Sequence, residues 1–150
     1  MSGETDLIKL YSGQILQLAA AIPNTDRLEN PDASVKKRSP LCGSTVTVDI
    51  KIENGRIANF GQDVKACALG QAAASVVGAH VIGQNRDGIE AARNALKTML
   101  KEDGPTPPAP FDGLEVLRPA RDYKNRHASI MLALDATAEA FEVAEQANCA

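Results

Sequence analysis

A period-two alternation followed by a tight-turn signal is the feature that most constrains the fold of this chain. Residues 45–52 place apolar side chains at every second position, which is the pattern of a strand with one buried face. Asn54-Gly55 follows, a strong signal for a hairpin turn, and residues 56–64 return as the partner strand. The basic run Lys36-Lys37-Arg38 is typical of a solvated strand edge. We therefore expect a small three-stranded antiparallel sheet, a meander.

Helical patterns occupy most of the remaining chain. Spacing, caps and helix-breaking residues predict helices over residues 5–21, 67–80, 85 or 87 to 100, and 125–147. Gly70 and Gly78 lie inside the second of these, where each costs roughly 1 kcal/mol relative to Ala. We therefore expect that helix to lie close against another backbone. Together these elements predict an α+β fold with helices packed on one face of the sheet and a long C-terminal helix.

Composition and charge narrow the classes of function. A chain of 150 residues suits one domain, residues 1–150. The net charge of −3 argues against nucleic acid as a partner. Polar residues interrupt the most apolar segment, residues 66–83, which suits a buried helix and not a membrane span. The amino terminus has no signal-peptide pattern, and three cysteines suggest no disulfide framework, so we expect a cytoplasmic protein.

Two cysteines stand at predicted breaks in regular structure. Cys42 lies between Pro40 and Gly43, in a segment suited to a tight turn that can close around a bound atom. Cys67 falls where the sheet gives way to a helix, whose free N–H groups and dipole favour a thiolate; Lys65 adds a nearby positive charge. A single cysteine in such a place is more often a small buried apolar residue. Two of them, joined by a hairpin, favour metal or sulfur chemistry.

His127 is a third candidate for that site. It follows a stretch rich in Arg and Lys, near the start of the last predicted helix. Taken alone, such a histidine is more often a surface or capping residue than a ligand. Cys149, close to the carboxyl end, is predicted to be an incidental thiol.

The same residues resemble the NifU/IscU-type iron–sulfur cluster scaffold family, which includes SufU-like proteins, over most of the chain. Residues 40–44, Pro-Leu-Cys-Gly-Ser, are similar to the family's Pro-x-Cys-Gly-Asp turn, and the meander with residues 53–57 follows it. Residues 67–75 resemble the second cysteine with its helix of small residues. Residues 126–129, Arg-His-Ala-Ser, fall where the family has its third cysteine.

The chain also departs from the family pattern. Ser44 replaces the aspartate that follows Cys-Gly, and the third cysteine is missing. One register places His127 at that cysteine, and another leaves Ala128 there. The ligand set implied by the resemblance is then Cys42, Cys67 and His127. Two thiolates and an imidazole suit both iron–sulfur centres and zinc, with one position of a tetrahedron left open.

The resemblance implies a scaffold or carrier for a [2Fe–2S] cluster or zinc, and not an enzyme. Such a protein would transiently bind iron and sulfide, or a preformed cluster, and pass it on. The expected partners are a cysteine desulfurase and apo-protein acceptors, with no nucleic acid or membrane, and the expected state is a monomer or weak dimer. Two alternatives remain: a zinc-bound sulfur-transfer partner of a cysteine desulfurase, and a degenerate homologue that keeps the fold as an interaction module.

Overall fold

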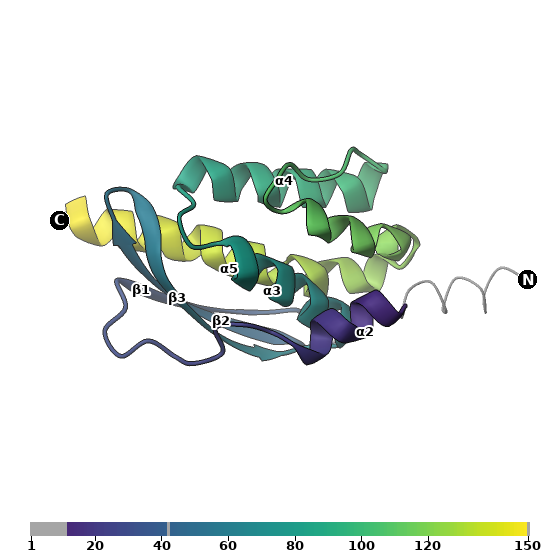
Figure 1. The fold of residues 1–150 in the computed structure, drawn as a ribbon, viewed down its shortest axis with the longest axis horizontal. Helices are drawn as coiled ribbons and strands as arrows, with labels where there is room; N and C mark the ends of the chain where they lie inside the picture. Colours follow the sequence, from purple (N-terminus) through teal and green to yellow (C-terminus); the bar gives the residue numbers. More distant parts are fainter. Residues whose placement is uncertain (1–11, 42, 150) are drawn as a thin grey trace, which may run out of the picture.

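The computed structural model describes residues 12–41 and 43–149, and it has the α+β architecture expected from the sequence (Figure 1). A three-stranded antiparallel sheet carries α-helices and one 3-10 helix, η1. In chain order the elements are α2 (Gly13–Ala20), β1 (Ala33–Arg38), β2 (Thr45–Glu53), β3 (Arg56–Lys65), α3 (Ala68–His80), α4 (Arg86–Glu102), η1 (Asp112–Asp122) and α5 (Lys124–Cys149). The sheet lies on one side and the helices lie on the other (Figure 1).

The strands form the predicted meander, in the order β1-β2-β3. The β2–β3 hairpin turns at Asn54 and Gly55, with φ angles of 55° and 76°. Positive φ at both central residues is the requirement of a type I′ turn, which matches the twist of the paired strands. The pairing of Glu53 with Arg56 fixes the register next to this turn. The Asn-Gly signal therefore identified both the turn and its position.

One face of the sheet forms the floor of the core. The side chains of Val46, Val48 and Ile50 alternate along β2 and are fully buried. Helix α5 packs on β1 and β2, while α3 packs on β3 and on α5. Helix α4 lies outside them, against α5 and η1 (Figure 1). The long last helix is therefore the element that connects the sheet to the outer helices.

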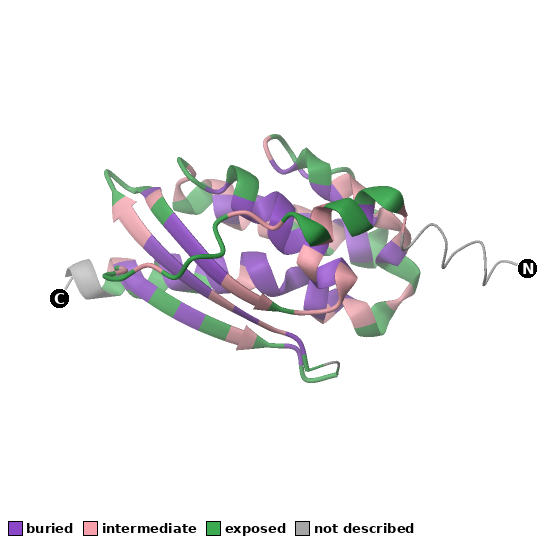
Figure 2. Cartoon of the chain, turned by 60° about the horizontal axis from the view of Figure 1, so that its bottom comes forward, coloured by how far each residue is buried: buried purple, intermediate pink, exposed green. Residues whose placement is uncertain are grey.

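The opposite face of the sheet is crossed by the segment between α2 and β1 (Figure 2). Gly61 permits this approach, because a Cβ atom there would collide with the backbone oxygen of Asp26. The carboxylate of Asp49, on the same face, is fully buried. It accepts hydrogen bonds from Arg27 Nε at 2.5 Å, from the Leu28 amide at 3.1 Å and from the Ser34 hydroxyl. A buried charge with several donors thus anchors the crossing segment.

The two edges of the sheet differ. The outer edge of β3 is covered, because Ile57 exchanges backbone hydrogen bonds with residues 83 and 84, and the Gln62 amide donates to the Asn24 carbonyl. Strand β1 forms the other edge and carries Lys36, Lys37 and Arg38. The prediction of a solvated strand edge at this basic run is confirmed.

The helical predictions agree with the structure except at Ser12 and in residues 112–122. Ser12, inside the first predicted helix, has an extended backbone and is the N-cap of α2. Cys67 is the N-cap of α3. The helices predicted to end at residues 100 and 147 end two residues later, at the last residues of α4 and α5. The part of the first predicted helix before residue 12 lies outside the described residues. Residues 112–122 form η1, which was not predicted: its three buried side chains, Leu114, Leu117 and Ala120, follow a three-residue repeat that gave little signal beside the proline-rich loop. No helix within residues 12–41 and 43–149 is long and apolar enough to cross a membrane.

Candidate metal or cluster site around Cys67

Cys67 occupies the N-cap position of α3, with extended backbone angles of φ −67° and ψ 169°. Its side chain makes no capping hydrogen bond to the first turn, so the thiol is available for other contacts. The residue is partly buried and forms no disulfide. The positive end of the α3 dipole lies at this residue. Lys65 is exposed, and its Nζ atom lies 3.9 Å from Asp63 Oδ2.

The loop between β1 and β2 is a closed turn. The Ser39 amide donates to the Ser44 carbonyl at 2.8 Å, and the Gly43 amide donates to the Ser39 carbonyl at 2.9 Å. Gly43 has a φ angle of +70°, a conformation that favours glycine. The predicted turn is therefore present on both sides of Cys42, which itself lies outside the described residues. Leu41, at the tip, is 74% exposed.

Hydroxyl groups connect this turn to Cys67 through the first part of α5. The Sγ atom of Cys67 lies 3.4 Å from the Oγ atom of Ser129. The Ser129 hydroxyl donates in turn to the Ser44 hydroxyl at 3.1 Å. Ser44 is two residues from Cys42 in the turn that Ser39 and Gly43 close. The structure thus brings the start of α3, the start of α5 and the turn next to Cys42 to one place.

Close helix packing makes this contact possible. An ideal Cβ atom on Gly70 would lie 2.6 Å from Ser129 Oγ and 3.1 Å from the Ser129 carbonyl oxygen. Only a residue without a side chain allows α3 and α5 to approach in this way. The prediction that the internal glycines mark close contact with another backbone is confirmed at Gly70. Gly78 behaves similarly, next to the carbonyl of Pro23.

His127 is buried on a side of α5 other than the one that carries Ser129. Its Nε2 atom lies 3.0 Å from the carbonyl oxygens of both Ala120 and Arg121. Because a carbonyl oxygen only accepts, Nε2 carries the proton and Nδ1 is the nitrogen left for a ligand. Residues two apart in an α-helix are separated by about 200° around its axis, so His127 and Ser129 project in nearly opposite directions. The side chain that meets Cys67 in this structure is Ser129.

Salt bridges hold the corner from which α5 begins. Arg121 Nη1 lies 2.5 Å from Asp103, and Arg118 Nη1 lies 2.8 Å from the same carboxylate. The hydrogen bonds from Arg121 and from Arg118 lower the pKa of Asp103 from its usual value. This corner fixes the end of η1 relative to α4, and it therefore orients the first turn of α5.

Sequence reasoning missed Ser129 and the role of Ser44. Both serines lie in the motifs that resemble the family. The comparison with those motifs, however, placed only His127 or Ala128 at the position of the family's third cysteine. The useful signal was Gly70, because its position on α3 determines which residue of α5 can approach. Among the described residues, no three His, Cys, Asp or Glu side chains are grouped closely enough to hold a metal ion.

The comparisons with known proteins identify the family. The family model of the NifU-like N-terminal domain matches residues 10–139. This chain belongs to the NifU-like N-terminal domain family. The region matched contains the whole sheet, the turn at residues 39–44, Cys67 and the first part of α5.

Solved structures agree with this assignment. The chain of a nitrogen-fixing NifU-like protein (N-terminal) from Brucella abortus is 43% identical to this NifU-like chain, with a TM-score of 0.92, and the match covers 94% of this chain and 98% of that one. A candidate iron–sulfur cluster assembly scaffold protein for the SUF system, from Fervidobacterium islandicum AW-1, shares the fold at 17% identity, with a TM-score of 0.78 and coverage of 89% and 98%. A search of curated proteins found no significant match.

Proposed function

We propose that this NifU-like domain, as one domain over residues 1–150, is an iron–sulfur cluster scaffold or carrier. It holds iron and sulfide, or a preformed cluster, as transient cargo and passes it to an acceptor protein. The proposed partners are a cysteine desulfurase and apo-protein acceptors, and the proposed location is the cytoplasm. No substrate turnover is required, so the proposal does not include an enzymatic activity. Family membership and the structural likeness to a candidate scaffold protein support it.

The observation that carries the proposal is the hydroxyl link from Cys67 through Ser129 to Ser44. This link ties the turn next to Cys42 to the start of α3, which is what a shared ligand set requires. Cys42 and Cys67 are the proposed thiolate ligands, and soft thiolates suit both iron–sulfur clusters and zinc. The family's third cysteine is missing from the sequence, so the cargo would be held by an incomplete set. An incomplete set favours release as well as binding.

Two side chains compete for the third position. His127 can ligate only through Nδ1, and its Nε2–H bond to backbone carbonyls is the kind of support that fixes the orientation of a ligating imidazole. It would have to reach Cys67 by a rotation of the first turn of α5. Ser129 already contacts the thiol but offers a harder oxygen. We propose His127 as the third ligand and Ser129 as the residue that holds the Cys67 thiol before loading.

Anaerobic purification with metal and acid-labile sulfide analysis tests the proposal. The protein is reconstituted with ferrous iron and sulfide and compared with Cys42→Ser and Cys67→Ser variants. Cys149→Ser is the matched control, because it removes a thiol that the proposal does not use. We expect the charge-transfer absorption of a [2Fe–2S] cluster in the native protein and in Cys149→Ser, and its loss in the other two variants.

Transfer to an acceptor completes the test. The loaded protein is mixed with an apo-ferredoxin, and the spectrum is followed after the two proteins are separated. A colourless, zinc-bearing protein that gains one stable sulfur atom from a cysteine desulfurase would replace the scaffold assignment with sulfur transfer. In that case the thiolate attacks the terminal sulfur of the desulfurase persulfide, and the desulfurase thiolate leaves. Metal-free protein that is indifferent to both cysteine substitutions would indicate an interaction module instead.

A further inference from the structure

A cavity lies on the side of α5 that faces away from Cys67. Its volume is about 600 Å³, which is within the range of small-molecule sites. The walls come from α4, the end of η1 and the first turns of α5. Ala128 and His127 line it, whereas Cys67 and Ser129 do not. It therefore lies apart from the contact between Cys67 and Ser129, although it shares His127 with the proposed ligand set.

The cavity is strongly basic within an acidic chain. Five cationic side chains line it, against one carboxylate, that of Asp135. These cations are Arg93, Lys97, Lys101, Arg121 and Lys124. Asp135 is already neutralised by Arg93, with an Nε–Oδ1 distance of 2.6 Å. Because the whole chain carries a net charge of −3, the positive charge at this cavity is a local excess and does not reflect the overall charge of the protein.

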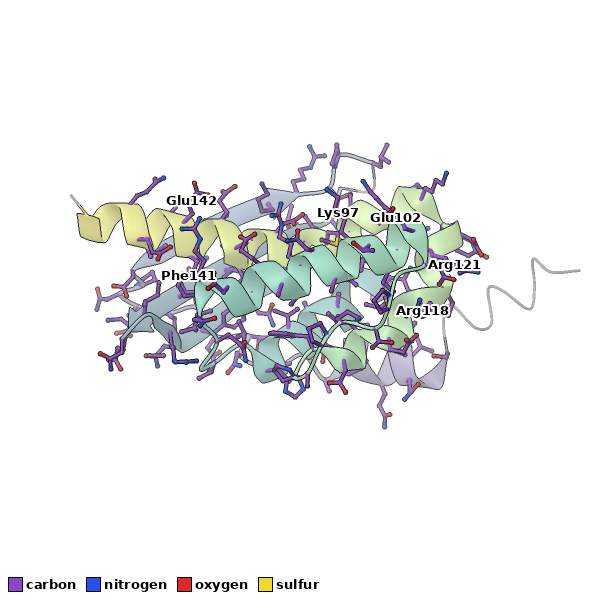
Figure 3. The ribbon with its side chains drawn as sticks, turned by 90° about the horizontal axis from the view of Figure 1, so that it is seen from above. Lys97, Glu102, Arg118, Arg121, Phe141 and Glu142 are labelled. Carbon is purple, nitrogen blue, oxygen red and sulfur yellow. The ribbon has the colours of Figure 1, made fainter. Side chains whose placement is uncertain are left out.

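The three lysines that line the cavity have no counter-charge in the described part of the protein. Lys97, Lys101 and Lys124 form no ion pair with any residue in the described part of the chain. Arg93, Lys97 and Lys101 succeed one another at four-residue spacing on α4, where like charges repel and destabilise a helix. In Figure 3, Lys97 lies between α4 and α5, and Arg121 lies at the end of η1 near the end of α4. An anion between these elements would relieve the repulsion.

Apart from His127 and Asp135, the rest of the wall is apolar. Leu100 and Met131 are both buried and contribute the hydrophobic surface of the cavity, together with Ala128. Cations around an apolar wall are the arrangement that binds an organic molecule with several negative charges, because the wall contacts carbon and the rim contacts carboxylate or phosphate. A simple inorganic ion would use only the rim.

From this geometry we infer that the cavity between α4, η1 and α5 binds a small organic polyanion, either a polycarboxylate or a nucleoside phosphate. The lysine ammonium groups of residues 97, 101 and 124 are the principal contacts to the anionic groups. Leu100 and Met131 contact the carbon skeleton. This inference does not depend on the proposed cluster function, since none of these five contact residues is a proposed cluster ligand.

Titrations of the metal-free full chain with citrate, ADP and inorganic phosphate test the inference. Binding is followed by calorimetry and by backbone amide NMR shifts, with sodium chloride added to equal ionic strength as the reference. We expect citrate or ADP to bind, and the largest shifts to fall in residues 97–101 and 124–131. Binding of citrate would identify the ligand class as a polycarboxylate, and binding of ADP would identify it as a nucleoside phosphate. Equal binding of inorganic phosphate would overturn the assignment of an organic ligand.

Charge-matched variants locate the site. Lys97→Gln with Lys101→Gln should weaken binding by about tenfold, and the control pair Lys36→Gln with Lys51→Gln, which removes the same charge from the sheet, should leave it unchanged. All four lysines lack ion pairs among the described residues, so folding should survive. Binding must also persist in Cys67→Ser, because citrate and ADP chelate metals. Absence of binding beyond the salt effect, equal weakening by the control pair, or loss in Cys67→Ser would each overturn the inference.

Discussion

The Sγ atom of Cys67 and the Oγ atom of Ser129 lie 3.4 Å apart, although 62 positions separate the two residues in the chain. The contact exists because α3 and α5 begin at the same end of the sheet and because Gly70 lets them approach. The first turns of two helices thus place a thiol and a hydroxyl together, and a further hydroxyl, that of Ser44, extends the group to the turn that contains Cys42.

Ser129→Cys should complete a set of thiols next to Cys67. The new sulfur would occupy the position from which the hydroxyl now contacts Cys67, and thiolates bind zinc and cluster iron better than a hydroxyl does. We expect tighter zinc binding in a competition titration with a chromophoric chelator. Ala128→Cys is the comparison, because Ala128 lines the basic cavity. A larger gain for Ala128→Cys would show that the first turn of α5 rotates on metal binding.

Gly70→Ala should destabilise the protein by about 1–3 kcal/mol, because the added methyl group would overlap the Ser129 hydroxyl and crowd its carbonyl. Urea unfolding measures the change. Gly13→Ala is the control, since a Cβ atom there meets nothing within 4 Å and the substitution should be neutral or slightly stabilising. Equal stability of both variants would show that the packing of α3 on α5 is looser than described.

His127→Gln should separate the structural role of this residue from a ligand role. A glutamine amide can still donate toward the carbonyls of Ala120 and Arg121, but it offers no equivalent of Nδ1. We expect stability within about 1 kcal/mol of the native protein and weaker zinc binding. His127→Phe loses the donor as well and should also lower the free energy of unfolding. Unchanged zinc affinity in His127→Gln would remove His127 from the ligand set.

Arg27→Ala should destabilise the fold through the buried carboxylate of Asp49. Burial alone would raise the pKa of Asp49, but hydrogen bonds from Arg27, Ser34 and the Leu28 amide outweigh it, and the net pKa lies below its usual value. Loss of the Arg27 guanidinium leaves this charge poorly compensated, at a cost of about 1–3 kcal/mol at pH 7. Urea unfolding at pH 7 measures it, with Arg38→Ala on the exposed edge strand as the control.

The same carboxylate predicts a pH dependence. A carboxyl group with a lowered pKa in the folded protein stabilises it at any pH above the unfolded value near 4, and this contribution is lost as the pH falls through the lower, folded value. The free energy of unfolding should therefore fall from about pH 4 downward. Asp49→Asn should be less stable at pH 7 and should show a shallower acid decline. An acid decline as steep as that of the native protein would point to other carboxylates.

The sheet and most helices could be predicted from the sequence because their signals are local. Period-two alternation, Asn54-Gly55 and the cap region at Cys67 each act within a few residues. The η1 helix could not, since its three-residue repeat is short and lies after prolines that mask it. The candidate site was predicted in part: Cys67 and the turn at residues 39–44 do converge. The contact of Ser129 depends on how α3 docks on α5, which no single segment encodes.

The basic edge of β1 has a consequence for the protein at high concentration. An unpaired strand edge can recruit an identical strand from another molecule. Here any such addition would set Lys36 and Arg38, with their exposed side chains, against the same cations of a neighbour, while Lys37 is held by Glu139 of α5 at 3.1 Å. The opposite edge is already covered by residues 83–84 and Asn24. Fibrillar growth by strand addition is thereby opposed at both edges of the sheet.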